Sequence, residues 1–333
     1  MSGAAQVFSP IDIALGLTDG LYSQGLAQQM VWLSGLLPYA QCSAVLERIG
    51  QYPIRNSSVW QYVQKYGEAL VLEGQHEAQQ VSPERLVLAS SSADHQHIKG
   101  VSMDGGMVNI RGEGWKEIKV GAIYDVSLRL ERDARTGEYA EFAHAQDLSY
   151  TAVLGDVQQF SPALWALAVE QQVPTARQSS VTADGAEWIW NLSADLFPDS
   201  SQIVDWFHAT DHLSEAAHAL FPDQPKRAET WFHQCQDDLF LGNIPAITDP
   251  LDAAGLSDHS HYFHTHQRRM QYQEFREQGL PIGSGSVEST VKQFKARLAG
   301  PGMRWKRPNA QRMLLIRAAV LDNSFDTRWK AVA

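Results

Sequence analysis

The order of the segments between residues 98 and 205 constrains the fold of this 333-residue chain most. Three β-rich segments of alternating polarity come first, and helix-like and strand-like segments then follow in turn. The expected strands are residues 98–104, 117–130, 138–147, 178–184 and 202–205, and the expected helices are residues 156–171 and 186–197. This order predicts an α/β fold, a mixed sheet flanked by helices on both faces.

The same order is that of an RNase H-like core. In such a fold the first strand is central and the fourth strand lies beside it. The first expected strand ends at Asp104 and the fourth at Asp184. We therefore expect these two acids to lie close together although they are far apart in the sequence.

The segments before this core predict a helical domain in residues 1–70 and a polar linker in residues 71–97. Ser43 is the expected cap of the second helix, and Asn56 or Ser57 that of the third. Two helices across a glycine-containing turn also fit a helix-turn-helix, which would place the third helix in a DNA major groove. Simple packing or dimerisation explains the same pattern, so both interpretations stay open.

The segments after residue 205 are expected to be helical. Residues 206–280 show amphipathic patterns without a clear strand, and residues 281–333 hold a closing helix and a basic C-terminal segment. The net charge is −14 over residues 99–287 and +7 over residues 288–333. An acidic middle suits divalent cations and a basic end suits phosphates. A solvated basic tail on an acidic globule is the alternative.

The composition and the terminal sequence bear on where in the cell the protein is expected. The N-terminus lacks the pattern of a signal peptide, and no stretch reaches the roughly 18 apolar residues of a membrane span. Cys42 and Cys235 offer no paired metal spacing and are expected to pack as small hydrophobic side chains. We expect a cytoplasmic protein that is associated with the nucleoid when bound to DNA.

Three acids have the setting that phosphoryl transfer needs. Asp104 and Asp184 are each followed by glycine, which lowers crowding, and Glu288 follows the loop Gly-Ser-Gly-Ser. Carboxylates suit Mg²⁺, and two ions can activate the attacking hydroxyl and stabilise the leaving oxygen. In isolation, each Asp-Gly is also typical of a turn, and a glutamate in a first helical turn also suits the helix dipole.

Four segments in this order resemble bacterial insertion-sequence transposases of the Kra type, relatives of the Mutator-like DDE transposases. They are VSMDGGMVNIRGEGWKEIKVGAIYDV, VTADGAEWIWNL, IVDWFHATDHL and GLPIGSGSVESTVKQFKARLAGPGMRWKRPNAQRMLLIRAAV. The resemblance implies an RNase H-like core with an all-helical insertion at residues 206–280. It also implies that Asp104, Asp184 and Glu288 are the catalytic residues and hold two Mg²⁺ (or Mn²⁺) ions.

The activity implied by the resemblance is metal-dependent cleavage and strand transfer of insertion-sequence DNA ends. The implied partners are double-stranded DNA, at the element's terminal inverted repeats and at its target, and a second copy of the chain in a homodimer. Family members often carry a cysteine-bearing, zinc-finger-like segment, whose cysteines this chain lacks, so no zinc site is expected. A transposase-derived non-catalytic DNA-binding protein and an RNase H-like nuclease or resolvase are the alternatives.

Asp205 and His208 are candidates for active-site support, because residues three apart lie on the same side of a helix. The alternative is that Asp205 caps the following helix and His208 packs beside it. His259, His261, His264 and His266 stand in an expected polar loop without nearby cysteines, which argues against a metal site.

The C-terminal segment interleaves basic residues with an aromatic one, as expected for backbone tracking with stacking on an unpaired base. A solvated helix face is the alternative. The expected DNA-binding residues are Lys292, Lys295, Arg297, Arg304, Trp305, Lys306 and Arg307.

Overall fold

The protein has a five-stranded mixed sheet with strand order β3-β2-β1-β4-β5. The computed structural model describes residues 22–81, 97–133, 135–283 and 285–332. β1, β2 and β3 are antiparallel, whereas β4 and β5 run parallel to β1. The strands are β1 (Ile98–Ile110), β2 (Gly114–Arg132), β3 (Tyr139–Val153), β4 (Gln178–Ala183) and β5 (Ser201–Val204). The predicted α/β class is confirmed, with β1 central and β4 beside it.

The first strand differs from its prediction. β1 does not end at Asp104 but continues to Ile110, because it pairs with β2 along its whole length. The two glycines after Asp104 therefore lie inside the strand. A Cβ atom on Gly106 would lie 3.1 Å from Cγ1 of Val291, so glycine here permits the close approach of a helix.

Helices cover both faces of the sheet. Met103 and Val108 of β1 point to opposite faces, because side chains alternate along a strand. Met103 packs in a core cluster with α6 and α7, and Val108 packs in a second cluster with α13 and α14. The bounds are α6 (Val157–Glu170), 3₁₀-helix η2 (Val173–Thr175), α7 (Glu187–Leu196), α13 (Gly285–Leu298), α14 (Arg307–Leu321) and α15 (Phe325–Val332).

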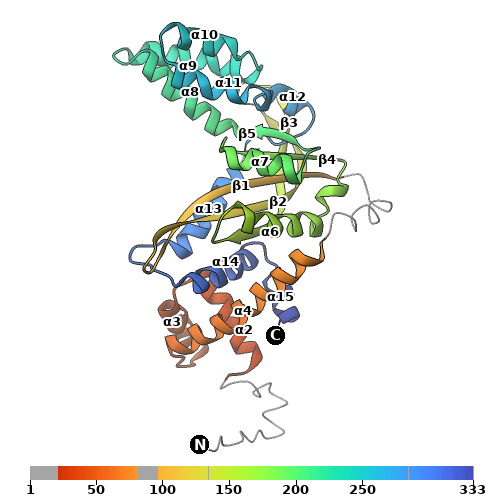
Figure 1. The fold of residues 1–333 in the computed structure, drawn as a ribbon, viewed down its shortest axis with the longest axis vertical. Helices are drawn as coiled ribbons and strands as arrows, with labels where there is room; N and C mark the ends of the chain where they lie inside the picture. Colours follow the sequence, from red (N-terminus) through yellow and green to blue (C-terminus); the bar gives the residue numbers. More distant parts are fainter. Residues whose placement is uncertain (1–21, 82–96, 134, 284, 333) are drawn as a thin grey trace, which may run out of the picture.

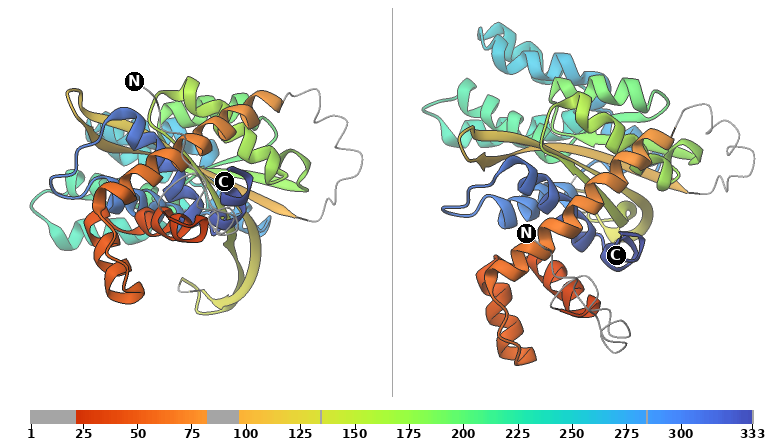
Figure 2. Two further views of the ribbon diagram at one scale, coloured as in Figure 1. Left: turned by 90° about the horizontal axis from the view of Figure 1, so that it is seen from below. Right: turned by 60° about the horizontal axis from the view of Figure 1, so that its bottom comes forward.

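Three N-terminal helices share the second cluster with α13 and α14. They are α2 (Gln24–Leu36), α3 (Tyr39–Gly50) and α4 (Asn56–Gln80). Arg297 Nε donates to the Ser34 carbonyl over 2.6 Å, and Arg317 Nη1 donates to that of Gly35 over 2.9 Å. Both carbonyls lie in the last turn of α2, where cations are favourable. The N-terminal helices are therefore joined to the C-terminal ones, as Figures 1 and 2 show.

The predicted starts of these helices need correction. Ser43 lies inside α3, where it is buried, and Pro38 holds the N-cap position instead. α4 begins at Asn56 without a side-chain cap, so neither Asn56 nor Ser57 caps it. α4 also extends to Gln80, well into the predicted linker, because it packs along α14, α6 and α15. Residues 82–96 of that predicted linker lie outside the described residues.

The chain from residue 206 to residue 280 is helical, without a strand. Its helices are α8 (Trp206–Leu220), α9 (Pro225–Phe240), α10 (Pro245–Ala253), α11 (Ser257–His266), η3 (Gln267–Arg269) and α12 (Tyr272–Glu277). Figure 1 shows α8–α11 at one end of the molecule and α2–α4 at the opposite end, with the sheet between them. Cys42 and Cys235 are buried, as predicted. In the described ranges, no helix has the length and apolar character needed to cross a bilayer.

Candidate active site

Asp104 and Asp184 stand side by side on neighbouring strands. Each paired residue of β1 faces the β4 residue 80 positions later, as Ser102 faces Thr182. Continuing this register by two residues places Asp104 beside Asp184, which directly follows β4. Adjacent residues of paired strands project to the same face of a sheet, so the two carboxylates share one face.

The Asp104 carboxyl has a perturbed pKa. This pKa is raised to about 6, mainly by burial and to a lesser degree by the nearby Asp184, although the Gly105 N–H, His208 and Lys295 act to lower it. One Asp104 oxygen accepts the Gly105 N–H over 2.6 Å. A carboxyl that is costly to ionise beside a second carboxylate is the arrangement that a divalent cation stabilises.

Asp184 occupies a tight turn between β4 and α7. Its Oδ1 accepts the Ala186 N–H over 3.0 Å, and the Tyr262 hydroxyl donates to its backbone carbonyl over 3.4 Å. Gly185 adopts φ +110°, a conformation that L side chains rarely adopt. An added Cβ there would also lie 3.2 Å from the Tyr262 ring. The glycine after Asp184 is thus required by the turn itself.

Asp205 is the third acid along the same edge. β4 and β5 are parallel with Ala183 facing Val204, so Asp205 follows β5 as Asp184 follows β4. It is fully buried, and its Oδ1 accepts the N–H groups of Phe207 (2.7 Å) and His208 (3.1 Å). Asp205 therefore caps α8, the alternative considered from the sequence. His208 lies close enough to Asp104 to lower its pKa.

Glu288 lies in the first turn of α13, but its side chain is outside the described part of the structure. The helix itself packs on β1, with Val291 above Gly106. Val291 is one turn after Glu288, and Gly106 is two residues after Asp104. This packing places the helix that carries Glu288 on the strand that carries Asp104, while convergence of all three carboxylates stays a prediction.

The donor set suits a hard cation. Asp104 and Asp184 each accept one backbone hydrogen bond, and a carboxylate has further acceptor sites. Mg²⁺ is commonly held by one or two carboxylates, with water and substrate phosphate completing its coordination. Among the side chains that the structure describes, which exclude Glu288, no group of three His, Cys, Asp or Glu residues is arranged to hold a metal ion.

The histidines near residue 260 belong to a helix, not to the polar loop expected from the sequence. α11 directs Tyr262 and His266 towards the Asp184 turn. His266 is buried, and burial lowers its pKa to about 4. His264 instead pairs with Asp252 over 3.1 Å. Since these two histidines have different neighbours, they do not form a common ligand set.

The predicted DNA-binding residues divide into two groups. Lys292, Lys295, Arg304, Lys306 and Arg307 are exposed, whereas Arg297 and Trp305 are buried. Arg297, Trp305 and Arg307 have the following contacts within the protein. Arg297 is only 3% exposed, the Trp305 indole N–H donates to the Leu298 carbonyl over 2.8 Å, and Arg307 forms an ion pair with Glu113. Arg297 differs from the other predicted DNA-binding cations because it is buried and borders a pocket instead of the open surface; DNA binding by all seven residues stays a prediction.

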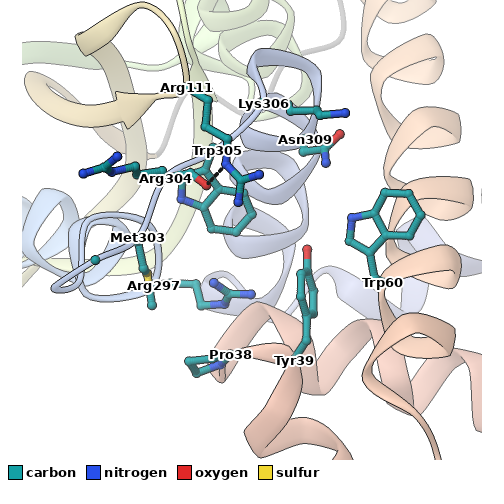
Figure 3. Close-up of a pocket in the computed structure, with 11 residues that line it drawn as sticks. Pro38, Tyr39, Trp60, Arg111, Arg297, Met303, Arg304, Trp305, Lys306 and Asn309 are labelled. Carbon is teal, nitrogen blue, oxygen red and sulfur yellow. Dashed lines mark hydrogen bonds between the residues drawn. The ribbon is translucent and has the colours of Figure 1, made fainter.

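A basic and aromatic pocket of about 540 Å³ lies between the N-terminal helices and the segment before α14. Figure 3 shows Tyr39 and Trp60 entering it from the N-terminal helices. Arg111 was not among the residues predicted from the sequence, and neither were these two aromatics. They come from three distant segments, so no local pattern joins them. The lining residues are Pro38, Tyr39, Trp60, Arg111, Arg297, Gly302, Met303, Arg304, Trp305, Lys306 and Asn309.

No protein-family model matches this chain, and no curated protein sequence matches it significantly. Its function is therefore inferred from the site.

Proposed function

We propose that this protein is a DDE transposase that cleaves and joins DNA, with Asp104, Asp184 and Glu288 holding two divalent metal ions. The observation that carries the proposal is the parallel register that places Asp104 beside Asp184. The raised pKa of Asp104 supports it, because a cation would replace the proton on a half-buried carboxyl. When bound, the two ions would supply activation of a hydroxyl nucleophile and stabilisation of the leaving oxygen.

The chain's own residues would position the reaction. The Gly105 and Ala186 N–H groups orient the two carboxylates, each through one oxygen. Lys295 of α13 is exposed and lies near enough to affect Asp104, so it is suited to contact a phosphate entering the site. The cap formed by Asp205 fixes the start of α8, and thereby His208, beside the same carboxyl.

The proposal extends to the architecture. A central β1, an adjacent parallel β4 and a helix that brings Glu288 over β1 are compatible with an RNase H-like core. In this interpretation residues 206–280 are an all-helical insertion between β5 and α13, and residues 22–80 are an N-terminal helical domain. DNA reading by α4 stays a prediction; the buried side of this helix is occupied by α14.

The test is a cleavage assay on a supercoiled plasmid carrying the DNA that flanks the coding region. We expect metal-dependent nicks with 3′-hydroxyl ends in Mg²⁺ or Mn²⁺, followed by strand-transfer products. Asp104→Asn, Asp184→Asn and Glu288→Gln should each abolish cleavage while DNA binding is retained. Asp195→Asn, at an exposed position of α7, is the matched control and should cleave normally.

The outcomes separate the alternatives. Nicking without strand transfer would favour a nuclease or resolvase. Binding without any metal-dependent cleavage would favour a non-catalytic DNA-binding protein. Normal cleavage by either aspartate variant would remove that residue from the mechanism.

A further inference from the structure

The pocket between the N-terminal helices and the segment before α14 combines cations with aromatic rings. Four of its lining residues are cationic, Arg111, Arg297, Arg304 and Lys306, and the lining set contains no acid. Its volume lies within the roughly 300–1,000 Å³ that is typical of ligand sites. An uncompensated positive pocket favours an anionic ligand.

Arg297 gives the strongest indication of a ligand. Arg297 is only 3% exposed, and burial lowers its pKa. Nε is satisfied by the Ser34 carbonyl, but Nη2 has no hydrogen-bond partner in the described part of the chain. The groups that act on its charge are Tyr39, whose hydroxyl is also within hydrogen-bonding reach of the guanidinium, and Cys42, not a carboxylate. A buried cation without an acid is costly unless an anion compensates it.

The walls of the pocket are held in place by backbone hydrogen bonds. The Trp305 N–H donates to the Asn109 carbonyl over 2.9 Å, and the Arg111 N–H donates to the Trp305 carbonyl over 2.8 Å. The segment around Trp305 thus runs beside the end of β1, forming an isolated parallel bridge with Ile110. Arg111 Nε also donates to the Arg304 carbonyl over 3.2 Å. The segment that carries Arg304, Trp305 and Lys306 is therefore held beside the end of β1 by the protein itself.

The aromatic residues identify the class of anion. Trp60 is 42% exposed and presents an accessible ring at the pocket, and Tyr39 enters beside it, as Figure 3 shows. The Arg297 guanidinium lies 5.3 Å from the Trp305 ring centroid and 5.5 Å from that of Tyr39. Cations beside exposed aromatic rings suit the phosphate and the base of a nucleotide that is not paired.

The same two elements, β1 and α13, carry residues of the carboxylate site and lead to the pocket. β1 carries Asp104 and leads to Arg111, seven residues later, which spans roughly 23 Å of strand. α13 likewise joins the two places, since Lys295 acts on Asp104 and Arg297 lines the pocket. One DNA molecule can therefore reach both sites, about seven nucleotide steps apart at roughly 3.4 Å per step.

We infer that this pocket binds an unpaired nucleotide of DNA, with its phosphate among Arg111, Arg297 and Arg304 and its base stacked on Trp60. This inference rests on the proposed function for the presence of DNA, but not for any step of the chemistry. It names a site at which a distorted DNA end would be held while the carboxylates act elsewhere on the same molecule.

The test measures binding of the full chain in EDTA, so that cleavage plays no part. The probes are a fluorescein-labelled 20-base-pair duplex and the same duplex with one bulged 2-aminopurine. We expect the bulged duplex to bind more tightly, with quenching of 2-aminopurine fluorescence. Trp60→Ala should reduce affinity for the bulge by about 5- to 150-fold and remove the quenching, and should reduce affinity for the paired duplex by clearly less. Trp32→Ala, at a comparably exposed tryptophan on α2, is the control and should behave as wild type.

Two further arms separate the phosphate from the base. Arg304→Gln, at an exposed position, should weaken binding of the bulged duplex and flatten its salt dependence. A duplex whose bulge carries an abasic sugar in place of 2-aminopurine should bind no more tightly than the paired duplex. Equal binding of paired and bulged duplexes by wild type would overturn the inference, as would a preference that survives Trp60→Ala. Competition by deoxyadenosine monophosphate at the affinity of the bulge would indicate a free-nucleotide site and would also overturn it. Loss of cleavage in the plasmid assay with retention of this preference would instead count against the proposed function alone.

Discussion

Asp184 raises the pKa of Asp104 from the neighbouring parallel strand, adding to the larger effect of burial. Ionisation of Asp104 is therefore disfavoured in the folded protein. This relationship joins the stability of the protein to its proposed chemistry, because whatever lowers the cost of that charge also stabilises the fold.

Asp104→Asn should stabilise the metal-free protein at neutral pH. The folded-state pKa is about 6, above the ordinary value of 3.8, so between these values the folded state binds more protons than the unfolded state. Stability should therefore fall as pH rises through this window. At pH 7 the variant should be more stable than wild type by about 1–2 kcal/mol, allowing for solvent screening. Urea unfolding in EDTA from pH 4 to pH 7 measures this difference, and a variant less stable than wild type at pH 7 would contradict it.

Divalent cations should make the wild-type protein more stable than Asp104→Asn, the reverse of the order expected without metal. A ligand that binds only the folded state stabilises it by about 2.7 kcal/mol at 100 times its dissociation constant. Mn²⁺ should therefore raise the thermal midpoint of wild type and of Asp195→Asn, but should raise that of Asp104→Asn or Asp184→Asn little. Equal stabilisation of all four proteins by Mn²⁺ would place the metal elsewhere.

Asp205 should be more important for folding than for metal binding. It is fully buried and caps α8 with two backbone hydrogen bonds, so Asp205→Ala should cost about 1–2 kcal/mol or more. Asp205→Asn keeps an oxygen acceptor, so its loss of folding stability should be much smaller. If Asp205→Asn folds normally but no longer cleaves DNA, the carboxylate acts in the chemistry as well.

Gly106→Ala should disturb the position of α13 over β1. The added Cβ would lie 3.1 Å from Cγ1 of Val291 and 3.3 Å from that of Ile118, so the helix must shift by a few tenths of an ångström. We expect a loss of about 1–3 kcal/mol from overpacking and a fall in cleavage larger than the stability change explains. Gly74→Ala, in the open interior of α4, is the control and should stabilise by about 0.5–1 kcal/mol. Unchanged cleavage by Gly106→Ala would separate α13 from the active site.

The sequence predicts best those elements whose residue pattern is local and repeated. The alternation of polar and apolar residues predicts the strands, and Asp184 follows β4 as expected. The position of Asp104 within β1 was not predicted, because Gly105 and Gly106 look like a turn until the pairing with β2 and the packing of α13 are known.

The burial of Arg297 could have been found in the sequence. It lies three residues after Phe294 and beside Leu298, on the buried face of an amphipathic helix, whereas Lys292 and Lys295 lie on its exposed face. The pairing of Arg307 with Glu113 joins residues 194 positions apart, and no local rule predicts it. Long-range contacts of this kind decide which basic residues remain available to a phosphate.

The salt dependence of DNA binding should come mainly from the basic residues that no acid within the protein neutralises. Each cation that neutralises a phosphate contributes about 0.9 to the slope of log affinity against log salt concentration. Replacing the exposed Lys295, Arg304 and Lys306 together by glutamine should therefore flatten the slope by roughly 2–3. Arg307→Gln should change it by clearly less, because Glu113 already neutralises that guanidinium. Glu113→Gln releases Arg307 and should steepen the slope by up to about 0.9. Fluorescence anisotropy on a paired duplex at several salt concentrations measures all three effects. An unchanged slope in the triple variant would mean that this segment is a solvated face, and DNA would then have to approach across another surface.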